Sequence, residues 1–447
     1  MLIRKLHIQN FRRFDHLNLS FEDDLTVLVA RNGHGKTSIL DAITVLLGPF
    51  VGAFDLGRSR GFAAADARQE LNQDTKTFRL SSHWPIRVEG TVAFPLTNSN
   101  ELSQDLQDHQ IARQLAGYKG STTVGEVVTL RRYGQILRDN INSSVDNILP
   151  VLAYYGNGRL WKTSKNLSRK KVLTENRSIG YEDCFSSSSN YLQVQQWMAK
   201  ATLLKLQQND PLLMPHVVMM TSRLEAIQQA VDEVLREEGW SAFGYYLGFE
   251  ELAMQHNELG LLPVSQLSDG IRSVVALVAD LAFRCVRLNS FYGNYAPEET
   301  NGIVLIDEIE QHLHPGWQQR ILQAIRRAFP KIQFIVTTHS PEVLSTVNSQ
   351  QIRILQDGKC FAAPPGALGA ESHRLLHDVL GLKDPRPPIP AVDELKEYLA
   401  LVDQEQWDSN RAKELRTILD TRYQGYEPSL LEADLHIENR MWEREMP

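Results

Sequence analysis

A run of eight residues near the N-terminus has the pattern of a loop that binds phosphate groups. Ala30-Arg-Asn-Gly-His-Gly-Lys-Thr37 follows the apolar run Leu25–Val29 and leads into Lys36–Leu47, an amphipathic stretch that predicts a helix ending at Gly48-Pro49. Backbone N–H groups at a helix start attract phosphate, a lysine reaches the β and γ phosphates, and a threonine hydroxyl binds magnesium. The segment therefore predicts a site for ATP with Mg²⁺, although alanine stands where the pattern has its first glycine.

The roles of the loop residues follow from this pattern. Lys36 is the expected catalytic cation, and Thr37 is an expected ligand of Mg²⁺. The alternative for the loop taken alone is a glycine turn that happens to precede a helix. The expected nucleotide contacts are Asn32, Gly33, His34, Gly35, Lys36, Thr37 and Ser38.

Two later strands also end in residues that suit phosphoryl transfer. Gly302–Ile306 is an apolar strand pattern followed by Asp307 and Glu308, where Asp307 can hold Mg²⁺ and Glu308 can orient and deprotonate the attacking water. Gln333–Thr338 is a second such strand and ends at His339, which can sense the γ-phosphate. Alone, the carboxylates could cap a strand and the histidine could belong to the core or surface. Together with the phosphate loop they predict ATP hydrolysis.

A further anion site is predicted at Leu267-Ser-Asp-Gly-Ile-Arg-Ser273, directly before an amphipathic helix, Val274–Leu288. The segment resembles the signature motif of ABC-type ATPases, with Ser268 and Gly270 in the serine and glycine places. In that family the motif clamps the γ-phosphate bound to a partner subunit. The resemblance therefore implies a head-to-tail dimer of this chain, or a higher oligomer, that shares its ATP sites.

Other segments resemble the RecF, SMC and AAA-21 branches of these ATPases. Asn10-Phe-Arg12 is similar to an element whose arginine approaches the nucleotide, which implies that role for Arg12, with Arg13 as the competing choice. Asp307-Glu-Ile-Glu-Gln-His-Leu-His-Pro315 resembles the DE-x-E-x-HLHP element. The loop Tyr154–Arg159 lies where relatives carry a glutamine that contacts magnesium, so Asn157 or Arg159 is left to take that role.

The expected fold is α/β: an ABC-type ATPase head with a mixed sheet and phosphate-loop helices, a short helical insertion and a helical C-terminal module. Two helices, Tyr191–Gln208 and Leu213–Glu238, are predicted in the insertion and lack the sustained heptads of a coiled coil. The polar segment Asn98–Gln114 is expected to be a surface excursion. The expected divisions are residues 1–160 and 241–365 for the two lobes of the head, 161–240 for the insertion and 366–447 for the C-terminal module, a candidate for partner docking.

Composition bounds the setting of the protein. The chain has 447 residues, a net charge of -7, three widely spaced cysteines and no apolar run long enough to span a membrane, so we expect a cytoplasmic protein with no membrane partner. The charge gives no global signature of nucleic-acid binding. Six basic residues between Arg159 and Lys171 could bind a nucleic-acid backbone, DNA or retron RNA/DNA, but a solvated loop is the favoured alternative.

The C-terminal region separates two functions. The sequence predicts two helices, Val392–Val402 and Arg411–Tyr423, and a striped tail, Leu430–Glu445, so we expect no nuclease domain in this region. The chain resembles PtuA-type ATPases of Septu and retron-associated antiphage systems, in chain length, short insertion and the segments Gly180–Phe185 and Leu376–Leu382. That resemblance implies a regulatory ATPase that controls a separate HNH nuclease of the PtuB type. The alternative is a stand-alone RecF-like ATPase of DNA repair or DNA binding, and a non-hydrolysing nucleotide-binding protein is disfavoured because Glu308 is present.

Overall fold

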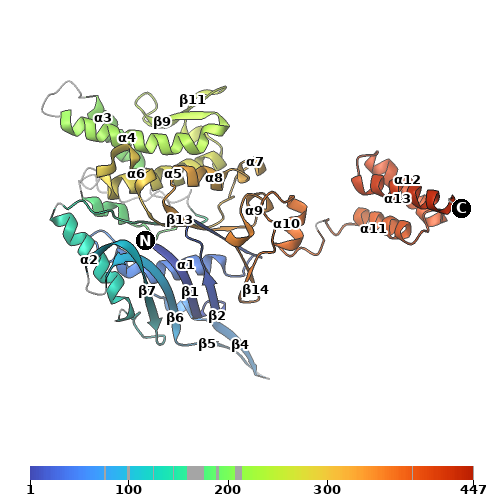
Figure 1. Ribbon diagram of the computed structural model, residues 1–447, viewed down its shortest axis with the longest axis horizontal. Helices are drawn as coiled ribbons and strands as arrows, with labels where there is room; N and C mark the ends of the chain where they lie inside the picture. The colour runs from blue at the N-terminus through green and yellow to red at the C-terminus, as the bar shows by residue number, and fades with distance from the viewer. Residues whose placement is uncertain are drawn as a thin grey trace. The chain divides into compact units, whose positions relative to one another are not determined.

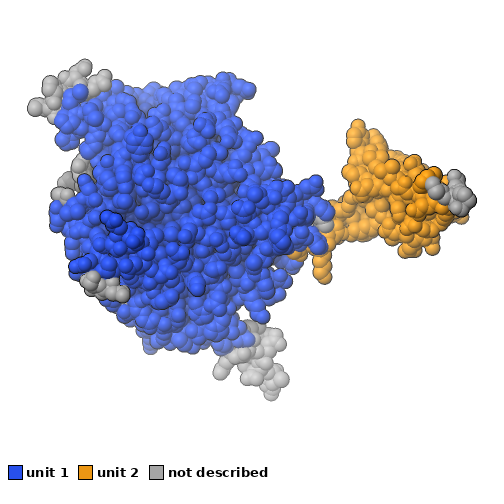
Figure 2. Space-filling view, viewed as in Figure 1, with its two compact units in different colours: residues 1–380 blue, residues 381–447 orange. Residues whose placement is uncertain are grey.

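The computed structural model (Figure 1) describes residues 1–74, 77–97, 101–123, 125–143, 145–158, 176–187, 191–206, 214–384 and 386–445. The chain forms two compact units, residues 1–380 and 381–447 (Figure 2). The expected division after residue 365 differs from this boundary, because helix α10 (Ser372–Asp378) belongs to the first unit. Leu375 and Val379 are buried in the core of that unit, and this burial holds the segment there.

A six-stranded mixed sheet forms the centre of the first unit. Five of its strands are parallel and β15 at one edge is antiparallel. Every residue of β3, β12, β13 and β8 is buried, as expected for parallel strands that are covered on both faces. The carboxyl ends of these four strands therefore meet at one edge of the sheet. The order is β15 (Lys359–Ala362), β14 (Ile352–Gln356), β3 (Leu25–Ala30), β13 (Ile332–Thr338), β12 (Gly302–Ile306) and β8 (Val151–Tyr155).

A second, antiparallel sheet faces helix α1 (Lys36–Val51), which packs against strands of both sheets (Figure 1). Helix α1 continues through Pro49, so the predicted end at Gly48-Pro49 is wrong. Phe50 and Val51 are buried, and the Gly52 N–H closes the helix on the Gly48 carbonyl at 2.9 Å. The order of the sheet is β2 (Phe14–Ser20), β1 (Leu2–Phe11), β6 (Ile86–Leu96) and β7 (Leu102–Leu115).

Strand β7 replaces the surface excursion that the sequence predicts over 98–114. It pairs with β6 from Ile86–Leu115 to Leu96–Leu102 and lies at the edge of the sheet. Its first half is mostly exposed and only the second half buries side chains, so the polar sequence there lacks a clear period of two. A two-stranded ribbon, β4 (Gln69–Asp74) with β5 (Thr77–Ser82), was also not expected.

Helices cover the other side of the mixed sheet. Helix α5 (Asp269–Leu288) contacts β8 and α4, and α4 also contacts α3 and α8. The helices predicted in the insertion are present as α3 (Tyr191–Lys205) and α4 (Met214–Leu235). A three-stranded sheet, which the sequence did not predict, follows them. The remaining elements of this layer are α8 (Ile321–Ala328), β9 (Trp240–Tyr246), β10 (Glu251–His256) and β11 (Gly260–Pro263); α2 (Val128–Asn142) packs on α1, and short helices are α6 (Ala296–Glu299), α7 (Pro315–Gln318) and α9 (Pro341–Leu344).

The second unit is three helices, α11 (Pro390–Asp403), α12 (Asn410–Tyr423) and α13 (Pro428–Glu445). Its small core includes Leu395, Leu415 and Leu419, which are fully buried. The predicted tail helices are therefore confirmed. In the described part of the chain, no helix is long and apolar enough to cross a bilayer.

Candidate nucleotide site

The phosphate loop joins β3 to α1 in a conformation that its glycines make accessible. Gly33 and Gly35 have φ of 75° and 93°, the left-handed region where other residues are strained. A Cβ on Gly35 would also come within 2.5 Å of the Phe14 ring. Ala30, by contrast, is the last residue of β3 and is buried there, so the first position of this loop accepts a Cβ. The departure from the sequence pattern thus has a local explanation.

Thr37 and Asp307 meet at the start of α1. The Thr37 hydroxyl donates to Asp307 Oδ2 at 2.7 Å, and the Thr337 hydroxyl donates to Asp307 Oδ1 at 2.6 Å. The Asp307 N–H donates to the Tyr155 carbonyl at 2.8 Å, so β8 also fixes this residue. Hydroxyl and carboxylate oxygens are the ligands that Mg²⁺ prefers. Their closeness at the phosphate loop fits a magnesium ion bound together with phosphates.

Glu308 turns away from the strand that precedes it. Its φ of 49° is left-handed, and its N–H donates to the Thr337 hydroxyl at 2.8 Å. A non-glycine residue in this region is strained, and such strain is common where a side chain must be aimed at a site. The Thr337 hydroxyl therefore orients both acidic residues: it contacts the side chain of Asp307 and the backbone N–H of Glu308.

His339 contacts the phosphate-loop lysine. Lys36 Nζ lies 2.6 Å from His339 Nε2 and donates to the Ala30 carbonyl at 3.0 Å. Burial lowers the pKa of His339 below its ordinary value, and the nearby Lys36 ammonium lowers this pKa further. Burial also lowers the pKa of Lys36, against the opposing effect of Asp307 and Glu308. A neutral His339 can accept the hydrogen bond from the Lys36 ammonium.

A cavity of about 480 Å³ opens beside Thr37 and Asp307. Its volume is within the usual range for small-molecule sites, roughly 300–1,000 Å³. Asn157 lines it, which puts this residue near the expected magnesium ligands, whereas Arg159 lies outside the described residues. The lining is Thr37, Asp41, Arg60, Tyr154, Gly156, Asn157, Gly158, Phe185, Ser187 and Asp307.

Asp41 and Arg60 are cavity residues that the sequence analysis did not identify. Asp41 lies on α1, with Arg12 NH1 at 2.6 Å from its Oδ2 and Arg60 NH1 at 2.6 Å from its Oδ1. Arg12 also pairs with Asp66 at 3.0 Å. The available signal was a lone acidic residue in an otherwise apolar helical run, Ile39–Leu47.

The two candidate arginines have different partners. Arg12, with a left-handed φ of 53°, is held by Asp41 and Asp66. Arg13 is exposed and donates from NH1 to the Gly33 carbonyl in the phosphate loop. The contact with the loop thus belongs to Arg13, while Arg12 is linked to the cavity through Asp41.

The remaining loop residues take different positions. Asn32 is exposed, and the His34 N–H donates to the Arg31 carbonyl at 3.2 Å. Ser38 is buried in the first turn of α1. The loop therefore offers Asn32 and Gly33 to solvent, while Lys36 and Ser38 lie inside.

Ser268 and Gly270 lie apart from this cluster. Ser268 is exposed and caps α5, accepting from the Ile271 N–H at 3.5 Å. Gly270 is buried against the His312 carbonyl, which a Cβ would approach to 2.4 Å. Within the described ranges, no hydrogen bond or ion pair joins either residue to the phosphate loop. The structure brings Lys36, Thr37, Asp307, Glu308 and His339 together and leaves the predicted second anion site separate.

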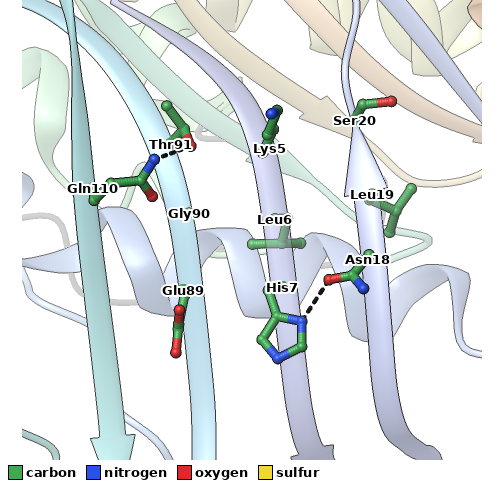
Figure 3. A pocket seen from close by; sticks show the side chains of 10 residues that line it. All are labelled: Lys5, Leu6, His7, Asn18, Leu19, Ser20, Glu89, Gly90, Thr91 and Gln110. Carbon is green, nitrogen blue, oxygen red and sulfur yellow. Dashed lines mark hydrogen bonds between the residues drawn. The ribbon is translucent and has the colours of Figure 1, made fainter.

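A second concavity, of about 430 Å³, lies on the antiparallel sheet (Figure 3). Four of its polar side chains form two pairs: His7 Nδ1 lies 2.6 Å from Asn18 Oδ1, and Gln110 donates to Thr91 at 2.8 Å. It lacks the strand-tip carboxylates of the first cavity. The basic segment Arg159–Lys171, predicted as a nucleic-acid contact or a solvated loop, lies outside the described residues.

Comparison with known proteins gives two family matches. The AAA_23 family, described as an AAA domain, matches residues 5–238. The AAA_21 family, described as an AAA domain, putative AbiEii toxin of a type IV TA system, matches residues 211–345. Together the matches contain the phosphate loop, Ser268, Asp307, Glu308 and His339.

Three relatives are similar over different lengths. The Retron Ec83 probable ATPase of Escherichia coli is 28% identical over 99% of this chain and 87% of its own. The Retron Vc95 probable ATPase of Vibrio cholerae serotype O1 biovar El Tor is 25% identical over 93% of this chain and 86% of its own. The Septu protein PtuA of Bacillus mycoides (strain KBAB4) is 35% identical over 29% of this chain and 16% of its own.

Proposed function

The chain belongs to the AAA domain family, and from that premise we propose that it binds ATP with Mg²⁺ and hydrolyses the nucleotide in a site shared by two copies. The observation that carries the proposal is the meeting of Lys36, Thr37, Asp307 and His339 at one sheet edge, with Thr37 and Asp307 in direct hydrogen bond at 2.7 Å. Each of these side chains suits a separate role in phosphoryl transfer, which would not be expected of residues brought together by chance.

The chain's own residues divide the chemistry of hydrolysis. The N–H groups of the phosphate loop bind the phosphates, and Lys36 exchanges its contact with His339 for the β and γ phosphates. Thr37 and Asp307 would hold the metal ion, which would supply charge neutralisation on the phosphate oxygens. Glu308 takes a proton from the attacking water, and neutral His339 steadies the γ-phosphate. Asn157, in the wall of the cavity, takes the place of the usual glutamine.

The second half of the site comes from another copy. Ser268 presents its hydroxyl at the start of α5, a helix of 20 residues whose N-terminal N–H groups attract anions. Because this start is exposed and makes no bond to its own phosphate loop, it is free to meet the γ-phosphate of a second copy. A head-to-tail dimer, or a higher oligomer built from such dimers, follows from this arrangement.

The biological role that we propose is the control of a separate nuclease in antiphage defence. Similarity to proteins named as retron ATPases extends over nearly the whole chain, and similarity to the Septu protein PtuA covers part of it. The partner would be an HNH nuclease of the PtuB type, restrained or activated according to the nucleotide state. A cytoplasmic location accompanies this role.

The C-terminal unit offers a surface for that partner. Leu431, Leu435 and Trp442 of α13 are 53%, 61% and 62% exposed and follow one face of the helix. The basic side chains of the helix, Arg440 and Arg444, form ion pairs with Glu405, at 3.7 and 2.5 Å. Glu443 pairs with Arg440 at 3.3 Å, and the exposed side chains of the helix also include Glu432 and Glu438. An apolar groove with a basic rim on the nuclease would fit this helix.

Co-purification tests this role against its alternative, a stand-alone RecF-like ATPase that binds DNA. The chain is expressed with and without the product of the neighbouring gene. A stable complex with an HNH protein, lost in Leu435→Asp but kept in the matched change Leu382→Asp of another exposed leucine, supports the regulatory role. A dimer alone, with DNA affinity that falls steeply as salt rises, supports the alternative.

A further inference from the structure

A fully buried ionic network connects the nucleotide side of the molecule with helix α5. Asp280 is 0% exposed and pairs with Arg284, one turn along the helix, at 2.8 Å. The Tyr155 hydroxyl donates to the same oxygen, Asp280 Oδ2, at 2.7 Å. In the described part of the chain the other oxygen, Oδ1, has no hydrogen-bond partner. Two side chains, Tyr155 from β8 and Arg284 from α5, thus converge on one carboxylate oxygen.

Tyr155 links this network to the expected magnesium ligand. It is the last residue of β8, and its carbonyl accepts the Asp307 N–H at 2.8 Å. The next residues, Gly156 and Asn157, line the cavity beside Thr37. The backbone of Tyr155 therefore contacts the nucleotide site, while its side chain contacts α5.

Arg284 contacts the segment that leads into a second wall of the same cavity. Its NH1 donates to the carbonyls of Gly180 and Glu182, at 2.8 and 3.0 Å. The chain that follows pairs with the end of β8: the Gly156 N–H donates to the Ser187 carbonyl at 2.9 Å. Ser187 and Phe185 line the cavity. Both segments that meet at this wall, the end of β8 and residues 180–187, are thus connected to one ion pair on α5.

Helix α5 begins at the other predicted anion site. It runs unbroken from Asp269 to Leu288 with Ser268 as its N-cap. Asp280 lies about 18 Å along the axis from Ser268, given the rise of an α-helix, and a rigid helix transmits a shift at one end to the other. A buried ion pair is weak evidence for stability, because apolar packing would serve at lower cost, and its best-attested use is to fix register.

We propose that Asp280 is a positioning residue that couples the nucleotide cavity to the signature motif of the same chain. When nucleotide and metal fill the cavity and Asp307 and Asn157 engage them, Tyr155 and the wall at residues 180–187 transmit the change to α5 through Asp280 and Arg284. The occupied chain then presents Ser268 and Gly270 in the position that a second copy requires. This inference rests on the proposed function.

The test uses the full-length chain and a tyrosine variant that keeps the core packed. Tyr155→Phe removes only the hydroxyl that binds Asp280. The matched control is Tyr246→Phe in β9, because the Tyr246 hydroxyl also donates a hydrogen bond, to the Ala242 carbonyl at 2.9 Å, and lies outside the segments that the proposal connects. Asp280→Asn is the second variant, since it keeps the volume of the side chain and removes its charge.

ATP affinity, ATP-driven dimerisation, kcat and thermal stability are measured for each variant. We expect Tyr155→Phe to bind ATP within about twofold of the wild type and to lose about tenfold in dimerisation and kcat, the usual size of a coupling between sites. Tyr246→Phe, which also loses one hydrogen bond, should keep its kcat. Equal kcat in the two tyrosine variants, with Asp280→Asn also active, would overturn the coupling while wild-type dimerisation still supports the shared site. A wild-type chain that neither dimerises nor hydrolyses ATP would overturn the proposed function itself.

Discussion

Two parts of the proposed site, the sheet edge at the phosphate loop and the start of α5, differ in how fully their polar side chains are hydrogen-bonded within the chain. At the sheet edge, Thr37, Asp307 and His339 all bond to other side chains of the same chain, at 2.6 to 2.7 Å. At the start of α5, Ser268 is exposed and accepts only a long bond from its own helix, 3.5 Å. Side chains that are already paired with one another can bind a ligand that enters between them. An exposed N-cap, by contrast, is available to another molecule. This contrast is expected of the proposed site, in which two copies of the chain contribute different groups.

The largest expected effect comes from the paired half. Lys36→Ala removes the buried ammonium that contacts His339 and the Ala30 carbonyl. We expect ATP binding to be abolished, measured by calorimetry, because no other cation of the phosphate loop replaces this contact. Lys331→Ala is the control, since Lys331 pairs with Glu299 at the surface. Full ATP affinity in Lys36→Ala would remove the phosphate loop from the account.

Loss of the proposed base should affect turnover alone. In Glu308→Gln we expect ATP affinity to be retained and kcat to fall by about 10²- to 10⁴-fold, the usual contribution of a general base. ATP-loaded dimers should accumulate, and light scattering would detect them. Normal turnover would show that Glu308 is not the base. Glu299→Gln tests for a general effect of removing a carboxylate.

The two halves should also differ in stability when each is changed. Asp41→Asn leaves Arg12 and Arg60 without their shared carboxylate, and we expect about 1–3 kcal/mol of lost stability. Ser268→Ala removes only a long cap bond, so its cost should lie near about 0.5 kcal/mol, the low end for caps. Urea unfolding measures both. A Ser268→Ala cost equal to that of Asp41→Asn would contradict the contrast between the halves.

The smallest effect concerns pH. The pKa of His339 is lowered from 6.5 in the folded chain by burial and by Lys36, so the unfolded chain binds more protons as pH falls below that value. The contribution of His339 to the free energy of unfolding, measured as the difference between the wild type and His339→Gln, is therefore complete above pH 6.5. It declines as the pH drops through the window below that value. Urea unfolding of both proteins across this window tests the sign. If the wild type became more stable relative to His339→Gln as the pH fell, the lowered pKa would be contradicted.

The sequence predicts the candidate residues at strand tips better than those held in place by long-range pairs. Lys36, Thr37, Asp307, Glu308 and His339 each follow a recognisable apolar strand, and parallel strands bring their ends to one edge. The local sequence pattern was therefore enough to predict that these residues lie close together. The fold class and the predicted helices of the insertion and tail are confirmed for the same reason.

Residues whose partners lie far along the chain were not predictable. Asp41 gains its role from Arg12 and Arg60, and Asp280 from Tyr155, 125 residues away. Strand β7 was missed because its polar half is exposed and pairs on one side only. The continuation of α1 through Pro49 depends on burial of Phe50 and Val51, which tertiary packing provides.

Mixing two inactive variants tests the shared site most directly. Ser268→Arg should lose turnover while keeping ATP affinity, and Lys36→Ala should lose both. In a mixed dimer one site combines the intact phosphate loop of the first variant with the intact Ser268 of the second. We predict recovery to about a quarter of wild-type turnover, since half of the dimers are mixed and each has one whole site. No recovery from any mixture, with mixed dimers present, would contradict the account.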